Sequence, residues 1–157
     1  MSGAGAADRD QVDGTGIRVA VIAGQWHDTI AAGLLAGAQR EVERLGATAE
    51  VIPVPGSFEL PVVAKTALEA GFDAAVALGV IIRGGTPHFE YVSAATTDGL
   101  TRVSLDTGKP VGFGVLTLDD EQQGLDRAGL EGSKEDKGAE AADAALRTAL
   151  VIKELRG

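Results

Sequence analysis

Cysteine is absent from this 157-residue sequence, which excludes disulfide bonds, thiolate metal ligands and cysteine nucleophiles. Histidine is nearly absent. His27 and His88 alone cannot make a multi-histidine metal site, and we expect no metal. Aromatic residues form only 4% of the chain, so its core has to be built from Val, Ile, Leu and Ala.

Long apolar runs and clusters of basic residues are missing as well. No stretch is long enough to cross a bilayer, and residues 1–16 lack the apolar run of a signal peptide, so we expect a cytoplasmic protein without a membrane partner. The net charge of −9, with no Lys or Arg cluster, argues against nucleic acid as a partner. An anionic substrate would therefore need a locally positive site.

Short apolar runs alternate with helical periodicity from Ile17 onward. The predicted strands are 17–24, 48–54, 73–82 and 110–118, and the predicted helices are 28–45, 57–70, 87–106, 120–128 and 138–155. This alternation predicts an α/β fold, a flavodoxin-like doubly wound sheet of four parallel strands with helices on both faces. The length suits one domain at residues 17–157, and residues 1–16, rich in Gly, Ala and Asp, are expected to form a flexible N-terminal arm.

Individual residues indicate where helices begin and which faces they bury. Asp28 and Ser57 are of the residue types that cap helices, and Pro87 suits the first position of a helix. In the final helix we expect the oppositely charged pair Asp143 and Arg147 to face outward.

The sharpest signal is GVIIRGGTPHFEY at residues 79–91, where two glycines follow a buried strand and lead into a helix. Sheets of this class bind ligands at the carboxyl ends of their strands. Gly84 and Gly85 allow close backbone approach, Thr86 adds a hydroxyl donor, and the free amides of a helix start attract an anion. His88 would then lie beside the anion, where it can exchange protons with a substrate. The helix dipole favours the neutral imidazole, whereas a bound phosphate favours the charged one.

A glycine turn followed by a surface histidine is the simpler interpretation of this segment, but the whole string points beyond it. RGGTPHFEYV (83–92) resembles the phosphate-loop and histidine motif of lumazine synthases. Three further segments are similar to motifs of that family, in the same order, and the resemblance extends over residues 17–155. They are PGSFELP (55–61), VGFGVLTLDDEQQGLDRAG (111–129) and DKGAEAADAAL (136–146).

The resemblance implies an enzyme of riboflavin biosynthesis, a transferase. It would condense 5-amino-6-ribitylamino-2,4-pyrimidinedione with 3,4-dihydroxy-2-butanone 4-phosphate, giving 6,7-dimethyl-8-ribityllumazine. The reaction has no redox step, so no cofactor is expected. In this family's pattern His88 transfers protons, and the phosphate is held by Gly84, Gly85, Thr86 and Arg127, the last from a neighbouring subunit.

The resemblance also implies which residues hold the pyrimidine and its ribityl chain. They are Trp26, Ser57, Phe58, Glu59, Val80, Ile81, Ile82, Phe113 and Lys137, with Phe113 coming from an adjacent subunit. Simpler interpretations exist for several of these residues. Trp26 suits a core or interface anchor equally well, Phe113 suits the core, and Lys137 suits a solvated helix start. Arg83 could help to neutralise the anion or be an exposed arginine at a strand end, and His27 is assigned no role.

Two departures from the family pattern affect these expectations. Asp136 stands where the family often has Asn, which places a negative charge next to Lys137. The segment AGLEGSKEDKG (128–138) is longer than the short turn of capsid-forming members and resembles the loop of pentameric ones. We therefore expect a homopentamer with its sites at subunit interfaces.

The same scaffold also supports other functions. A receiver-type regulatory domain needs an acidic pair after the first strand and a phosphorylatable Asp after the third, and neither is present. A riboflavin-synthase-like relative, or a non-catalytic flavin-binding or shell protein, shares the same binding residues and stays an alternative.

Overall fold

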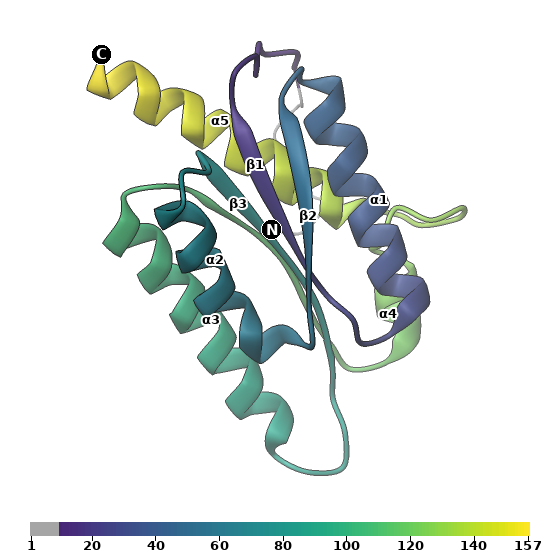
Figure 1. Ribbon diagram of the computed structural model, residues 1–157. Coiled ribbons are helices and arrows are strands. Elements are labelled where there is room, and N and C mark those ends of the chain that lie inside the picture. The colour runs from purple at the N-terminus through teal and green to yellow at the C-terminus, as the bar shows by residue number, and fades with distance from the viewer. Residues whose placement is uncertain (1–9) are drawn as a thin grey trace.

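A parallel sheet of four strands lies at the centre of the structure, a computed structural model that describes residues 10–157 (Figure 1). The strands follow the order β2-β1-β3-β4 across the sheet. Their bounds are Arg18–Gly24 for β1, Thr48–Val54 for β2, Ala74–Ile82 for β3 and Val111–Leu118 for β4. The continuous apolar run of β3 is typical of a strand covered on both faces, and its residues are buried almost throughout.

Helices cover both faces of this sheet (Figure 1). On one face lie α1 (Asp28–Arg44) and α5 (Lys137–Arg156). On the other lie the short 3₁₀ helix η1 (Ser57–Glu59), α2 (Leu60–Glu69) and α3 (His88–Thr107), while the short α4 (Glu121–Leu125) follows β4. Alternate strand residues enter the two cores, Val21 beneath α1 and α5 and Ile22 beneath α2. The predicted flavodoxin-like doubly wound fold is confirmed.

The roles of three residues at helix starts differ from the prediction. Asp28 is the first residue of α1 rather than its cap, and His27 precedes it in the left-handed conformation with a φ of 62°. Ser57 does not cap α2, because its buried side chain faces Gly79 of β3 instead. Pro87 precedes α3 by one residue.

Glycines let α1 approach α5 and the segment before it closely. A Cβ added to Gly138 would lie 2.0 Å from the carbonyl oxygen of Leu34, and one added to Gly33 would lie 2.5 Å from that of Ala128. Asp143 was expected to face solvent with Arg147 but is buried, because α1 covers this side of α5. Burial raises the pKa of the Asp143 carboxyl, and the neighbouring Glu41 carboxyl raises it further, against the opposing effect of Arg147 at 2.9 Å.

The packed chain begins before β1. Within the expected arm of residues 1–16, residues 1–9 lie outside the described part of the structure. The Gly14 amide donates to the carbonyl of Leu45 at 2.7 Å, and the Gln11 side chain donates to that of Arg44 at 3.0 Å, so residues 10–16 lie against the end of α1. Across residues 10–157, every helix falls short of the length and apolar character that a membrane span requires.

Candidate functional site

Three connections meet at the carboxyl edge of the sheet, where the strand order reverses between β1 and β3. A Cβ added to Gly24, the last residue of β1, would lie 3.4 Å from the carbonyl oxygen of Leu78 in β3 and 3.6 Å from the carbonyl carbon of Gly56. The loops after β1 and β2 therefore approach β3 closely. Ligands of doubly wound sheets bind at such a switch point.

Trp26 and Glu59 share the surface above Gly56. A Cβ on Gly56 would lie 3.1 Å from Cδ1 and Nε1 of the Trp26 indole and 3.5 Å from Oε1 of Glu59. The indole is 67% exposed, so it is not an anchor of this chain's own core. It borders a shallow hollow of about 470 Å³ that is lined by Gln25, Trp26, His27, Asp28 and Pro55.

Ser57 is the buried neighbour of this surface. A Cβ on Gly79 would lie 2.4 Å from the Ser57 Oγ, and the Ser57 carbonyl accepts a hydrogen bond from Thr96 Oγ1 at 3.3 Å. Ser57 thus joins the end of β3 to α3, while the adjacent Phe58 is exposed. In this chain its hydroxyl faces the sheet, so a ligand contact would come from the main chain of the segment.

The end of β3 has a strand partner on one side only. Pairing of β3 with β1 ends at Leu78, whereas its pairing with β4 continues to Ile82. Val80 and Ile81 are buried and Ile82 is half-buried, so their side chains belong largely to the core. The main-chain groups of residues 79–82 along the β1 side are the part of this segment that can recognise a flat polar ring.

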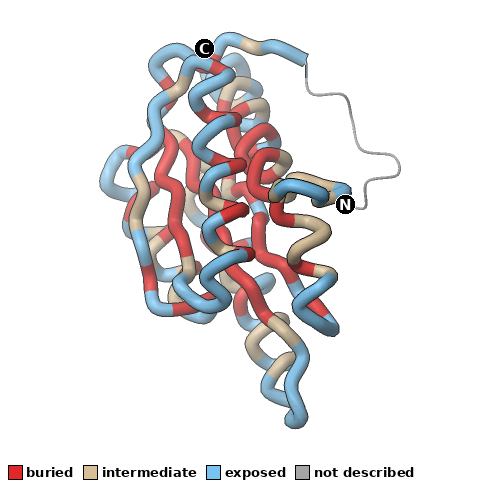
Figure 2. The backbone as a smooth tube through the Cα atoms, turned by 90° about the vertical axis from the view of Figure 1, so that its right-hand side faces the viewer, coloured by how far each residue is buried: buried red, intermediate tan, exposed pale blue. Residues whose placement is uncertain are grey.

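The β3–α3 connection projects beyond the body of the protein as an exposed loop (Figure 2). Gly84 and Gly85 have ordinary negative φ angles, and a Cβ on either would meet nothing within 4 Å. The fold itself therefore does not require glycine at these two positions. His88 is exposed at the start of α3, and its amide points at Thr86 Oγ1 at 3.5 Å.

Arg83 is held at the base of this loop rather than free in solvent. Its Nε donates to Asp119 Oδ1 at 3.0 Å, its Nη1 pairs with Glu90, and its guanidinium lies over the Phe89 ring, 4.3 Å from the centroid. The hydrogen bond to Asp119, followed by the one to Glu90, raises the pKa of Arg83, and Arg83 lowers the pKa of Glu90.

Arg127 and Lys137 form a second group around Glu135. Arg127 Nη1 donates to the carbonyl of Gln123 at 2.9 Å, and its Nε lies 3.9 Å from Glu135 Oε2. The Lys137 ammonium lies 3.5 Å from the same carboxylate oxygen and 3.4 Å from Glu140 Oε1. Lys137 begins α5, as its simpler interpretation required, but its side chain is only 14% exposed, so it is not solvated.

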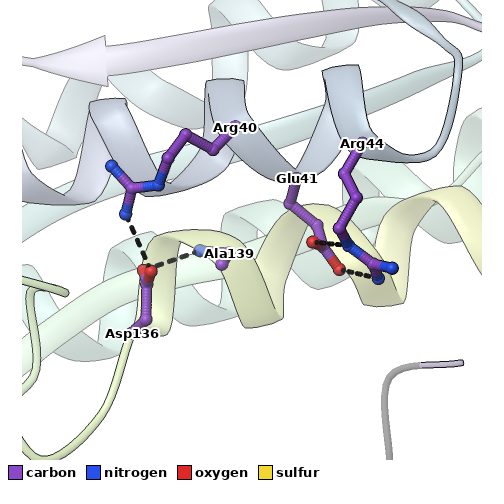
Figure 3. Close-up of a pocket in the computed structure, with 5 residues that line it drawn as sticks. All are labelled: Arg40, Glu41, Arg44, Asp136 and Ala139. Carbon is purple, nitrogen blue, oxygen red and sulfur yellow. Dashed lines mark hydrogen bonds and ion pairs between the residues drawn. The ribbon is translucent and has the colours of Figure 1, made fainter.

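The carboxylate of Asp136 is directed away from Lys137. It accepts the amide of Ala139 at 3.1 Å, which caps α5, and pairs with Arg40 of α1 at 3.0 Å (Figure 3). An antiparallel bridge joins Asp136 to Ala128 and closes the intervening segment into a hairpin. The negative charge of Asp136 is therefore paired with Arg40 of α1 rather than with Lys137.

Phe113 lies apart from both groups. It sits opposite Ala77 on β4, the edge strand of the sheet, and is 47% exposed rather than part of the core. With Thr97, Leu100 and Thr101 of α3 it lines a hollow of about 270 Å³. One chain thus brings the ends of β1 and β2 together beside β3, whereas the contacts of Arg127, Lys137 and Phe113 are with other residues. Residues 10–157 contain no cluster of three His, Asp or Glu side chains suited to a metal ion.

Comparison with known proteins identifies the chain's relatives. The family model described as 6,7-dimethyl-8-ribityllumazine synthase matches residues 16–153. The chain belongs to this family. A lumazine synthase of Leifsonia xyli subsp. xyli is 72% identical over the full length of both chains. Lumazine synthases of Clavibacter michiganensis subsp. michiganensis and Streptomyces coelicolor are 70% and 56% identical, covering 100% and 99% of this chain and 99% and 97% of their own.

Membership of the lumazine synthase family confirms the resemblance found in the four motifs. Sequence reasoning missed the partners that hold the candidate residues, namely Asp119 and Glu90 around Arg83 and Glu135 and Glu140 around Lys137. Glu140 could have been found, because it lies three residues after Lys137 in a helix. Asp119 and Glu135 carried no such signal, since both partners come from loops.

Proposed function

We propose that this chain condenses 5-amino-6-ribitylamino-2,4-pyrimidinedione with 3,4-dihydroxy-2-butanone 4-phosphate to give 6,7-dimethyl-8-ribityllumazine. Identity to lumazine synthases over the whole chain supports the reaction. The observation that carries the assignment of the site is the pair Gly84 and Gly85, which the fold does not require and which precede an exposed His88.

The pyrimidine would occupy the surface above Gly56. The Trp26 indole offers a flat apolar face for the ring, and Glu59 offers acceptors for the ribityl hydroxyls. The main chain of Val80, Ile81 and Ile82, unpaired on the β1 side, would bond the edge of the ring. Phe58 and the main chain at Ser57 complete this part of the site.

The phosphate of the ketose would lie in the loop of Gly84, Gly85 and Thr86. The free amides of the loop and of the start of α3 suit an oxyanion, and the absence of side chains at the two glycines leaves room for it. The ring amine then attacks the ketone, water leaves to give an imine, inorganic phosphate is eliminated, and the ring closes with loss of water. His88 moves the protons of these steps, and most of the acceleration comes from holding the two substrates together.

A complete site would combine two copies of the chain. Arg127 and Lys137 gather around Glu135, and Phe113 lines a hollow beside α3, which supports their contribution to a neighbour's site. Exposed apolar side chains of α2 and α3, among them Val62, Tyr91 and Leu105, support self-association through that face. We propose that the assembly is a homopentamer. We also propose that it acts in the cytoplasm, because a phosphorylated substrate does not cross membranes unaided.

Purified protein incubated with both substrates tests the function. We expect the fluorescence of the lumazine product to appear together with one equivalent of inorganic phosphate, and neither signal when one substrate is omitted. Conversion of added lumazine to riboflavin would favour a riboflavin-synthase-like relative, and flavin binding without turnover would favour a non-catalytic protein. In analytical ultracentrifugation we expect a pentamer, and a clean monomer would contradict shared sites.

A further inference from the structure

Arg83 ties together both ends of the projecting loop. Its main-chain amide donates to the carbonyl of Leu118 at 2.8 Å, and its Nε donates to Asp119 at 3.0 Å, which fixes the loop's first end to the β4–α4 turn. Its Nη1 and the face of its guanidinium hold Glu90 and Phe89, which lie in the first turn of α3. We call Arg83, Phe89, Glu90 and Asp119 the Arg83 clasp.

The segment between these ends has no other attachment. Within the described part of the chain, the hydrogen bonds of residues 84–87 go only to the first turn of α3. Neither Gly84 nor Gly85 packs against another element. The spacing between the loop amides and the start of α3 therefore depends on the clasp.

The charges of the clasp decide what Arg83 can do. Its single positive charge faces two carboxylates, Asp119 and Glu90, so little of it is left unopposed for a bound anion. The planar guanidinium donates hydrogen bonds to the two carboxylates through different nitrogens and stacks on the Phe89 ring at the same time. A lysine ammonium cannot reproduce this arrangement. A cation that serves mainly as a phosphate ligand would not be balanced in this way.

We propose that Arg83 is a positioning residue of the phosphate subsite: the Arg83 clasp holds the loop of Gly84, Gly85 and Thr86 at the spacing that the ketose phosphate requires, and Arg83 does not itself neutralise the phosphate. The inference rests on the proposed function and deepens it. It assigns a role to a residue for which sequence alone left two interpretations open.

Asp119→Ala separates the two roles because they predict opposite signs. If Arg83 were a phosphate ligand, removing a competing carboxylate would free its charge, and the KM for the ketose phosphate would fall. If the clasp positions the loop, losing one attachment raises that KM by about tenfold, while the KM for the pyrimidine stays within about twofold. The matched control is Asp106→Ala, which breaks an exposed ion pair with Arg102 on α3 at 3.6 Å and should change neither KM.

Arg83→Lys tests whether charge alone suffices. The clasp predicts a KM for the ketose phosphate close to that of Arg83→Gln, because neither variant spans both acids and the Phe89 ring. Restoration of the wild-type KM by lysine would overturn the proposal, as would a lowered KM in Asp119→Ala. Inhibition by inorganic phosphate, used as a probe of the subsite, should weaken in the same variants and by a similar factor.

Hydrogen exchange of the free protein gives a readout that does not depend on turnover. We expect the amides of residues 84–86 and 88–91 to exchange faster in Asp119→Ala and Arg83→Lys than in wild type or Asp106→Ala, with the amides of the sheet unchanged. Equal exchange in all four proteins would overturn the clasp. A wild-type protein that makes no lumazine would defeat the proposed function instead, so the two failures are distinguishable.

Discussion

The indole of Trp26 lies against Gly56, where a Cβ would come within 3.1 Å of two of its ring atoms. The indole is therefore supported from one side by backbone, while most of its surface stays exposed. This is the arrangement that a stacking partner for a flat ring needs, because a supported ring loses little freedom when a ligand binds.

Trp26→Ala should raise the KM for the pyrimidine by about two- to twelvefold, since stacking on an aromatic ring contributes about 0.5–1.5 kcal/mol. Trp26 is the only tryptophan of the chain, so its fluorescence reports on the site directly. We expect the pyrimidine to quench this emission and the ketose phosphate alone to leave it unchanged. Tryptophan emission that does not change when the pyrimidine is added would show that Trp26 is not part of the site.

Gly85→Ala should leave the protein as stable as wild type, within about 0.5 kcal/mol in urea unfolding, because the added Cβ meets nothing within 4 Å. It should nevertheless raise the KM for the ketose phosphate, because the methyl group enters the space proposed for the anion. The control is Gly112→Ala, whose Cβ would lie 2.3 Å from the Ala141 carbonyl oxygen. That variant should lose about 1–3 kcal/mol.

His88→Ala should lower kcat by about tenfold to a hundredfold and change both KM values little, because proton transfer is one part of a reaction driven mainly by positioning. The exposed imidazole contributes little packing, so the free energy of unfolding should stay unchanged. Steady-state kinetics with full turnover in this variant would show that the role assigned to His88 is wrong.

Arg127→Ala should raise the KM for the ketose phosphate and leave that for the pyrimidine unchanged, because the guanidinium is proposed to reach only the phosphate. Arg102→Ala, at an exposed position of α3, controls for the loss of one positive charge. An equal rise of both KM values would count against a phosphate contact.

The buried carboxyl of Asp143 makes stability depend on pH. Its pKa is raised above the usual 3.8, so between the two values the folded state binds more protons than the unfolded state, and stability falls as the pH rises. Asp143→Asn removes this carboxyl and with it this pH dependence of stability. In urea unfolding, the free energy of unfolding of the variant should therefore increase relative to that of wild type as the pH rises from about 4 to about 7. A difference that stays constant over this range, as expected for the surface control Asp106→Asn, would contradict the raised pKa.

Periodicity and turn residues predicted the sheet and nearly all helix limits. Each strand of the structure lies within one residue of its predicted range, because the apolar runs are interrupted sharply by Gly, Pro and charged residues. Side-chain capping was predicted less well. Asp120 and Asp136 cap helices through their carboxylates, while Ser57 turns its hydroxyl to Gly79, a contact that depends on tertiary structure alone.

The part of the site formed by consecutive residues could be predicted from the sequence. The part that depends on contacts between distant segments was predicted less well. Gly84 to His88 form one string with a local physical meaning. The contact of Arg127 with Glu135 crosses a hairpin bridge, and the environment of Arg83 depends on Asp119, which is 36 residues away. The burial of Asp143 likewise follows from where α1 lies rather than from the pattern of α5.

The bridge between Ala128 and Asp136 has a practical meaning for anyone who wishes to attach cargo to this protein. The bridge encloses residues 129–135, which Leu130 and Ser133 also hold to the body, while the tip at Gly132 touches nothing within 4 Å of where a side chain would begin. Arg127 and Lys137 adjoin the two bridged residues and lie outside the segment 129–135. A peptide grafted at the tip would be displayed outward while the two cations keep their places.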